Sequence, residues 1–239
     1  MRYILFLLFS SSFILTSCNY GFKKTVKGNG IVTSEQRSFS SAQKIKLVGG
    51  LDLQITQSTN KKVTVLGESN LLAFIETKEQ DGWLIIKTKE NINLKPNTTI
   101  EINIETDVLE AVSVVGSGNI NGLNKFEGGE QLAIDVTGSG NVTIATNTPK
   151  IIASIAGNGN IILSGETKEA SIKIAGSGDY KALDLKTETT KINIAGSGNA
   201  SVYAAAELDI QIAGSGDISY LGNPTITKKI AGSGKIKQL

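Results

Sequence analysis

The chain of 239 residues carries 24 Lys and Arg against 22 Asp and Glu, with no histidine, one cysteine and one methionine. A nearly balanced charge does not favour a nucleic-acid partner, because such proteins gather basic residues on one face. The missing histidine removes the commonest general base and metal ligand, so we expect no catalytic residue, no metal site and no cofactor.

The first seventeen residues predict a secretory signal peptide, because Arg2 precedes an apolar run that ends in small residues. The segment 1–17 leads into "LTSC" at Leu15–Cys18. A branched apolar residue, two small residues and a cysteine resemble the lipobox of bacterial lipoproteins, in which the cysteine is acylated and becomes the new N-terminus. Cys18 has no disulfide partner in this chain. We therefore favour lipidation at Cys18 over a plain signal peptide.

The lipobox resemblance implies an exported protein that is held in the cell envelope by its acyl chains, with the outer membrane as the expected location. Residues 18–40 are interpreted as the lipidated cysteine and a flexible basic tether. We expect the protein to contact the membrane through the acyl chains on Cys18 alone. Whether the protein faces the periplasm or the cell surface stays open.

Residues 41–110 are rich in predicted strands but lack the turn that repeats later. The stretch "KIKLVGGLDLQITQ" at Lys44–Gln57 sets a Gly-Gly turn between two alternating runs and predicts a degenerate early coil. Residues Asn70–Phe74 have short helical character, and Asp81-Gly82 predicts a hairpin. Trp83, the only tryptophan, is expected in the core. This part is interpreted as the first coils and cap of the following solenoid; a separate β domain is the alternative.

Residues 111–239 repeat one turn, Gly-Ser/Asn-Gly followed by a polar residue, at spacings of 18 to 22 residues. A fixed period of this length indicates a stacked, quasi-one-dimensional architecture. The glycines of the seven turns are Gly116 and Gly118, Gly138 and Gly140, Gly157 and Gly159, Gly176 and Gly178, Gly196 and Gly198, Gly214 and Gly216, and Gly232 and Gly234.

The residues beside each turn alternate between apolar and polar, as in Ile172-Lys-Ile174 and Val142-Thr-Ile144. Period 2 is typical of half-buried strands, and no helical pattern lies between them. Each unit is therefore one coil of short strands that pairs in parallel with its neighbours. The sequence predicts an all-β protein with a right-handed parallel β-helix, whose coils have about 18–22 residues, preceded by a less regular strand-rich portion; residues 41–239 form one continuous domain in this interpretation.

The composition of the turn has a structural explanation. Glycine allows positive φ and close approach of stacked backbones, and the small residue before each turn, as in Ala156 and Ala175, is expected in a tight interior corner. The polar residue after the turn forms a column, in which Asn tolerates left-handed geometry and can hydrogen-bond from coil to coil. The column comprises Asn119, Asn141, Asn160, Asp179, Asn199 and Asp217. In the last coil Lys228 replaces an inward apolar residue, which would oppose end-to-end stacking; oligomerisation stays open.

These features together resemble the head GIN domain family of auto-transporter adhesins, which is frequent among Bacteroidetes lipoproteins. The resemblance rests on the repeated turns and on "KLVGGLDLQIT", "LGESNLLAFI" and "GWLIIKT", and it runs from about Ala42 to Leu239. It implies a parallel β-helical fold and a role in adhesion or surface binding.

Other chemistries fit the sequence less well. Calcium binding needs six to eight oxygen ligands, and only Asp179 and Asp217 are acidic in the turn column. A polysaccharide-cleaving β-helix needs paired carboxylates or a carboxylate beside basic residues, whereas the outward positions before the turns are mixed: Ser113, Asp135, Ser154, Lys173, Asn193, Gln211 and Lys229. Tyr180, Tyr203 and Tyr220 do not form one stripe for sugar stacking.

The favoured function is therefore a non-catalytic, lipid-anchored envelope protein that acts as an adhesin or surface-binding module, with an unidentified glycan or protein ligand. A periplasmic structural or regulatory module without an adhesive ligand is the alternative. A degenerate carbohydrate-active β-helix is the third interpretation.

Overall fold

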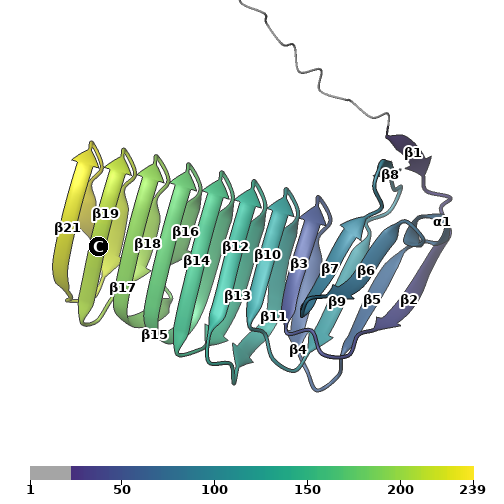
Figure 1. Ribbon diagram of the computed structural model, residues 1–239, viewed down its shortest axis with the longest axis horizontal. Coiled ribbons are helices and arrows are strands. Elements are labelled where there is room, and N and C mark those ends of the chain that lie inside the picture. The colour runs from purple at the N-terminus through teal and green to yellow at the C-terminus, as the bar shows by residue number, and fades with distance from the viewer. Residues whose placement is uncertain (1–22) are drawn as a thin grey trace, which may run out of the picture.

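The computed structural model describes residues 23–239; the predicted signal peptide and Cys18 lie outside the described residues. The described part is all-β apart from one helical turn, and its main body is a β-solenoid. Figure 1 shows the turns stacked along the long axis, with β21 at one end and a less regular N-terminal portion at the other. The predicted fold class is confirmed.

Each turn of the solenoid has one strand before the glycine-rich corner and one after it. The pre-turn strands are β3 (Lys44–Gly49), β10 (Ala111–Gly116), β12 (Leu132–Gly138), β14 (Lys150–Gly157), β17 (Leu185–Gly196), β19 (Glu207–Gly214) and β21 (Thr225–Gly232). The post-turn strands are β4 (Leu53–Gln57), β11 (Asn119–Glu127), β13 (Asn141–Asn147), β16 (Asp179–Ala182), β18 (Ala200–Tyr203), β20 (Ile218–Leu221) and β22 (Ile236–Gln238). Strand β15 (Asn160–Gly176) supplies a post-turn segment and the next pre-turn segment without a break.

Successive pre-turn strands pair in parallel and keep one register, so the corners lie directly over one another. Gly116 is paired with Gly49 on one side and with Gly138 on the other. Alternate residues point inwards: Val114, Val136 and Ile155 are all buried. The inward Ile, Val and Leu side chains form one continuous core along the stack.

The first turn along the chain is not the first turn in the stack. Strands β3 and β4 form the early coil that the sequence predicts, and they pair on one side with β10 and β11. On their other side they pair with β7 (Trp83–Thr88) and β9 (Glu101–Thr106), which come later in the chain. After β4 the chain forms β7 and β9 on one side of the early coil and then returns to form β10 and β11 on its other side. The early coil therefore lies between these two pairs of strands.

Antiparallel strands cover the N-terminal end. Strand β5 (Lys62–Glu68) pairs with β9 and with the edge strand β2 (Val32–Ser38), while β6 (Ile75–Gln80) pairs with β7. Helix α1 (Ser69–Leu72) buries Leu71 and Leu72, so the expected short helix is confirmed. The β6–β7 hairpin reverses at Asp81 and Gly82, which both have positive φ, as predicted.

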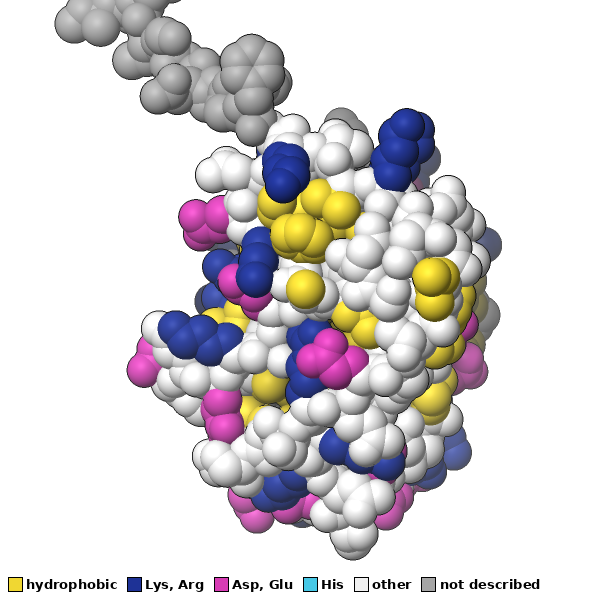
Figure 2. Space-filling view, turned by 90° about the vertical axis from the view of Figure 1, so that its right-hand side faces the viewer, with side chains coloured by type: hydrophobic (Ala, Val, Ile, Leu, Met, Phe, Trp, Pro, Cys, Tyr) yellow, Lys and Arg dark blue, Asp and Glu magenta, His cyan; other side chains and the backbone are white. Residues whose placement is uncertain are grey.

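A separate two-stranded ribbon lies at the point where the chain enters this end. Strand β1 (Lys24–Lys27) pairs in parallel with β8 (Ile92–Lys95). Figure 2 faces this end and shows hydrophobic side chains gathered near the entering chain, with Lys and Arg around them. Ile31 and Val32, at the start of the edge strand, are 64% and 49% exposed.

Two predictions for the N-terminal part are wrong. Strands β1 and β2 lie within residues 18–40, yet both pair with the rest of the domain instead of forming a flexible tether. Trp83 is half-buried on the outer face of β7, because its neighbours Leu84 and Ile86 take the inward positions of that strand.

The C-terminal end of the stack carries a charge in an interior column. Lys228 of β21 is the register partner of Ile210, which is fully buried in the preceding turn. Another coil placed on this end would have to bury the ammonium group, at a large desolvation cost. This placement opposes end-to-end stacking of the solenoid.

Glu79 of β6 ties down the loop that joins β2 to β3. Its two carboxylate oxygens accept hydrogen bonds from the backbone amides of Ser40 and Ser41 at 3.0 and 2.8 Å, and from both hydroxyls. These donors favour the charged form and lower the pKa of Glu79 to about 2.

Glu79→Gln is expected to remove a stabilisation that depends on pH. Because the folded-state pKa lies below the unfolded value, the stabilisation is fully present above about pH 5 and is lost as the pH falls toward 2. Thermal unfolding of both proteins should therefore show a wild-type advantage at pH 6 that shrinks steadily between pH 5 and pH 2. A difference that stays constant over this range would contradict the assignment.

Candidate ligand-binding face

The polar column after the turns forms a hydrogen-bonded ladder at one corner of the stack. The Asn141 amide donates to Oδ1 of Asn119 at 2.7 Å, and the Asn160 amide donates to Oδ1 of Asn141 at 2.7 Å. Asp179 accepts from the Asn199 amide at 3.0 Å, and Oδ1 of Asn199 accepts from the backbone amide of Asp217 at 3.0 Å. The ladder serves contacts between coils.

The ladder begins one coil earlier than the sequence indicates, since Asn119 donates to Asp52 at 2.8 Å. Asp52 follows the Gly49-Gly50 turn of the early coil, where the spacing from Gly49 equals that from Gly116 to Asn119. None of the column residues has positive φ; among the described residues only Asp81 and Asn91 do so without being glycine. The suggestion that left-handed geometry selects Asn in the column is therefore wrong.

Both glycines of each turn lack room for a Cβ against the preceding coil, and the first also adopts a backbone conformation that favours glycine. The first has positive φ throughout, from 117° at Gly138 to 140° at Gly214 among the seven repeats. The second does not, but a Cβ there would overlap the carbonyl oxygen of the preceding coil, as Gly178 illustrates against Gly159. The backbone amides of Ser177 and Gly178 both donate to the carbonyl oxygen of Gly157 in the preceding coil, at 2.9 and 3.1 Å. These amides are occupied by the stack and do not form an anion-binding loop.

The small residues before the turns face outwards, not into an interior corner. Ile155 and Ile174 take the inward positions, so the next residues, Ala156 and Ala175, point to solvent and are exposed. The same placement recurs along the stack at Ala195, Ala213 and Ala231. Alternation of the strand already required this outcome, and the prediction of an interior corner is wrong.

The outer surface of the pre-turn sheet is the candidate ligand-binding surface, here called the pre-turn face. It extends from β6 and β7 across β3 and β10 to β21. One outward column along it starts at Lys46 and continues through the positions expected from the sequence: Ser113, Asp135, Ser154, Lys173, Asn193, Gln211 and Lys229.

The pre-turn face is hollowed at its N-terminal end by a groove of about 850 Å³, here called the basic groove. Its lining includes the apolar side chains of Val48, Ala73 and Ile85, which are at least partly exposed. The cationic residues Arg37, Lys46, Lys78, Lys87 and Lys89 also line it, against one carboxylate, Glu76. The groove therefore combines apolar walls with an excess of positive charge.

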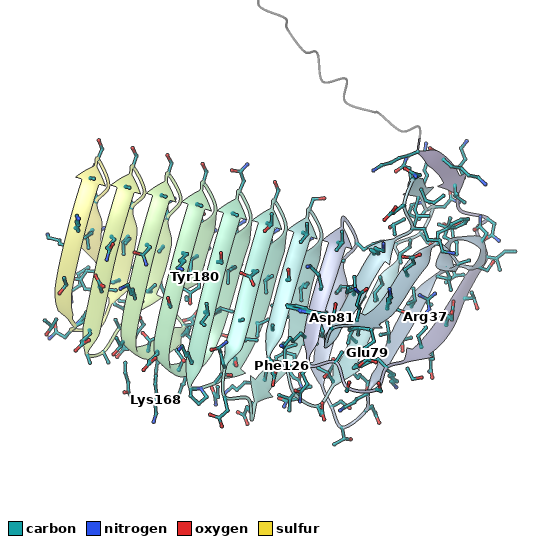
Figure 3. The ribbon with its side chains drawn as sticks, in the orientation of Figure 1. Arg37, Glu79, Asp81, Phe126, Lys168 and Tyr180 are labelled. Atoms are coloured by element: carbon teal, nitrogen blue, oxygen red, sulfur yellow. The ribbon has the colours of Figure 1, made fainter. Side chains whose placement is uncertain are left out.

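Two of these cations are already engaged. Arg37 donates to the carbonyl oxygens of Ile75 at 2.6 Å and Leu72 at 3.0 Å, and pairs with Glu35 at 3.0 Å. Figure 3 shows Arg37 in the N-terminal part of the molecule, among the strands that cover this end. The Lys87 ammonium lies 3.5 Å from Glu76. Arg37 thus connects β2 to the segment from Leu72 to Ile75 through hydrogen bonds, and the charge of Lys87 is partly neutralised by Glu76.

The other three cations form no ion pair among the described residues. The Lys46 ammonium lies 5.8 Å from the centre of the Trp83 ring, and the Lys89 ammonium lies 6.0 Å from that of Phe74. These distances are at the outer limit of cation–π attraction. Lys46, Lys78 and Lys89 therefore keep their charge available to a ligand.

A second, smaller groove of about 500 Å³ lies farther along the face, over the outward alanines of the later turns and beside Lys173 and Lys229. It carries fewer charges than the basic groove. Asp135 stands between the two; burial raises the pKa of its carboxyl group, while the Lys46 charge acts in the opposite direction. The sequence offered no signal for the basic groove, because its cations come from four separate segments.

Within the described residues, no group of three or more His, Cys, Asp or Glu side chains is arranged to hold a metal ion. Over the same residues, no helix has the length and apolar character required to span a membrane. The three tyrosines within the described residues lie apart from the basic groove: Tyr180 is in the core, and Tyr203 and Tyr220 are partly buried.

Comparison with known proteins agrees with this architecture. A family profile described as "Putative auto-transporter adhesin, head GIN domain" matches residues 42–224. The chain belongs to the head GIN domain family. The description of this family indicates a cell-envelope or surface protein. The resemblance seen in the sequence is confirmed.

Solved structures of proteins from Parabacteroides and Bacteroides species share the fold. A "Putative lipid binding protein" from Parabacteroides distasonis is 31% identical with a TM-score of 0.73, covering 90% of this chain and 100% of that chain. A "putative adhesin" from Bacteroides fragilis is 24% identical with a TM-score of 0.84, at 90% and 100% coverage. A "putative adhesin" from Parabacteroides distasonis is 26% identical with a TM-score of 0.75, also at 90% and 100% coverage. A search of curated proteins gives no match.

Proposed function

We propose that this head GIN domain protein is a non-catalytic, lipid-anchored protein of the outer membrane that binds a surface or envelope ligand through its pre-turn face. The observation that carries the proposal is the basic groove on that face. In this groove Lys46, Lys78 and Lys89, which form no ion pair among the described residues, lie beside apolar side chains of the sheet. A β-solenoid holds such groups at fixed intervals of about 4.8 Å, which suits an extended ligand.

The proposal of a non-catalytic role rests on the chemistry of the same face. Asp135 is the carboxylate of the outward column that begins at Lys46, and the register places Ser113 and Ser154 beside it, not a second acid. A glycosidase-like mechanism requires two carboxyl groups across the scissile bond. Binding without turnover is therefore the function that this arrangement supports best.

Cells that carry the protein should bind ligand only when the domain is anchored. Wild-type cells and a Cys18→Ser strain would be compared in a screen of polysaccharides and matrix proteins, with protease treatment of intact cells. We expect wild-type binding that protease removes, and loss of cell-associated protein and binding in the Cys18→Ser strain. Resistance to protease until the outer membrane is opened would contradict surface adhesion and favour a periplasmic module.

Lipid binding is a second candidate function, favoured by the relative from Parabacteroides distasonis that is described as a lipid binding protein. The apolar walls of the basic groove, with Val48, Ala73 and Ile85, would suit an acyl chain as well as a sugar ring. Phospholipid vesicles belong in the same screen for this reason. Binding to vesicles alone would favour this function over adhesion.

A further inference from the structure

We infer that the basic groove is a binding site for an extended anionic polysaccharide, one that bears carboxylate or sulfate groups. The inference rests on the proposed binding function and specifies the site and the ligand class. Three features carry it: the arrangement of the cations, the apolar residues between them, and the recessed shape of the groove.

The cations are arranged in a row that crosses the strands. Lys78 of β6, Ile85 of β7 and Lys46 of β3 are direct register partners, so they share one outward row. Two strand spacings, about 9–10 Å, separate the two lysine backbones. A chain lying across the strands would therefore meet a cation, an apolar side chain and a second cation in succession.

This alternation matches the chemistry of an acidic polysaccharide. Each sugar ring offers a flat face of C–H groups, which can pack on Ile85 and its neighbour Val48, while its acidic substituents can reach the two ammonium groups. Neutral glycans would leave the lysines without a partner, and a purely apolar ligand would have to desolvate them at a cost. The groove thus favours a ligand with spaced negative charges and apolar faces between them.

The shape of the groove argues against a flat anionic surface as its ligand. The cations line a hollow of about 850 Å³. A planar layer of lipid headgroups contacts the rim of such a hollow but leaves its apolar walls exposed. A single polysaccharide chain can enter and cover them.

Trp83 provides a signal for binding. It is the only tryptophan of the chain, and the Lys46 ammonium lies 5.8 Å from its ring. An anion that draws Lys46 away from the ring would change the emission of Trp83. Trp83 lines a neighbouring hollow with Lys44 and Glu110, not the basic groove, so its fluorescence reports on the groove through the position of Lys46.

The test is a titration of the purified protein with polygalacturonate, dextran sulfate and neutral dextran of matched length, at low and at physiological salt. We expect the anionic chains to bind and to change Trp83 emission, with an affinity that falls as salt rises. Neutral dextran should not bind. Lys46→Glu and Lys78→Glu should each weaken binding at least ten-fold, with Lys46→Glu followed by a labelled polysaccharide because it alters the environment of Trp83.

The matched control is Lys125→Glu, the same charge reversal at an exposed lysine of the post-turn strand β11, which does not belong to the pre-turn face. We expect its affinity to stay within two-fold of wild type. Equal weakening by Lys125→Glu would overturn the groove as the site while leaving a binding function intact. Absence of binding by either anionic chain would overturn the inference, and so would equally tight binding of polyglutamate or of anionic vesicles that depends on Lys46 and Lys78.

Discussion

Gly196→Ala is expected to destabilise the solenoid by about 2 to 6 kcal/mol. Gly196 has φ of 131°, a conformation that costs a residue with a side chain about 1–3 kcal/mol. The added Cβ would also overlap the carbonyl oxygen of Gly176 in the preceding coil. Relief of that overlap must push two coils apart, and overpacking of this kind typically costs a further 1–3 kcal/mol.

The neighbouring Ser197→Ala is the matched control for this change. Ser197 is exposed at the same corner, and its backbone amide donates to Gly176 at 2.9 Å. The alanine keeps this backbone bond, so its free energy of unfolding should lie within about 0.5 kcal/mol of wild type. Urea unfolding followed by far-ultraviolet circular dichroism measures both variants. Equal stability of Gly196→Ala and wild type would contradict the close stacking of the corners.

The repeated part of the fold was predictable because each of its determinants is local. One turn at a nearly constant spacing fixes the coil length, and alternation beside it fixes which residues face the core. The same rule, applied one residue further, places Ala156 outside next to the inward Ile155. The prediction of an interior corner was wrong because it relied on the small size of the alanine side chain. The alternation of the strand, and not side-chain size, determines whether that residue faces the core or the solvent.

The order of the N-terminal layers was not predictable from the sequence. Strand β3 lies between β7 and β10, although β7 follows it by many residues. A local pattern indicates that a segment is a strand but does not indicate which distant strand pairs with it. The same limit applies to Trp83, whose exposure depends on what covers the outer face of β7.

The basic groove illustrates this limit for function. Its cations come from four segments, namely β2, β3, β6 and the end of β7 with the loop that follows it, and none of these segments is itself a basic run. The near-zero net charge of the chain hides the local excess of positive charge. Only the antiparallel pairing of β6 with β7 brings Lys78 into one row with Lys46.

The interior column that contains Tyr180 provides the second large effect on stability. Tyr180 is only 1% exposed and stacks between Ile161 and Ala200, its partners in register. Figure 3 shows it within the body of the stack. The small side chain of Ala200 leaves space beside the large ring. Tyr180→Ala should therefore open a cavity and lower the free energy of unfolding by about 3–5 kcal/mol.

Tyr180→Phe is expected to stabilise the protein, in contrast to Tyr180→Ala. The phenol oxygen of Tyr180 is buried without a hydrogen-bond partner among the described residues, and burial raises the pKa of the group because the charged form would be desolvated. On folding, this hydroxyl loses its hydrogen bonds to water and gains none in return, which lowers the stability of the folded state by about 1–3 kcal/mol. Removal of the hydroxyl keeps the packing of the ring and should raise the free energy of unfolding by about 1 kcal/mol, measured by urea unfolding beside Tyr180→Ala. A loss of stability in Tyr180→Phe would show that the hydroxyl has a partner in solution, most simply a buried water molecule.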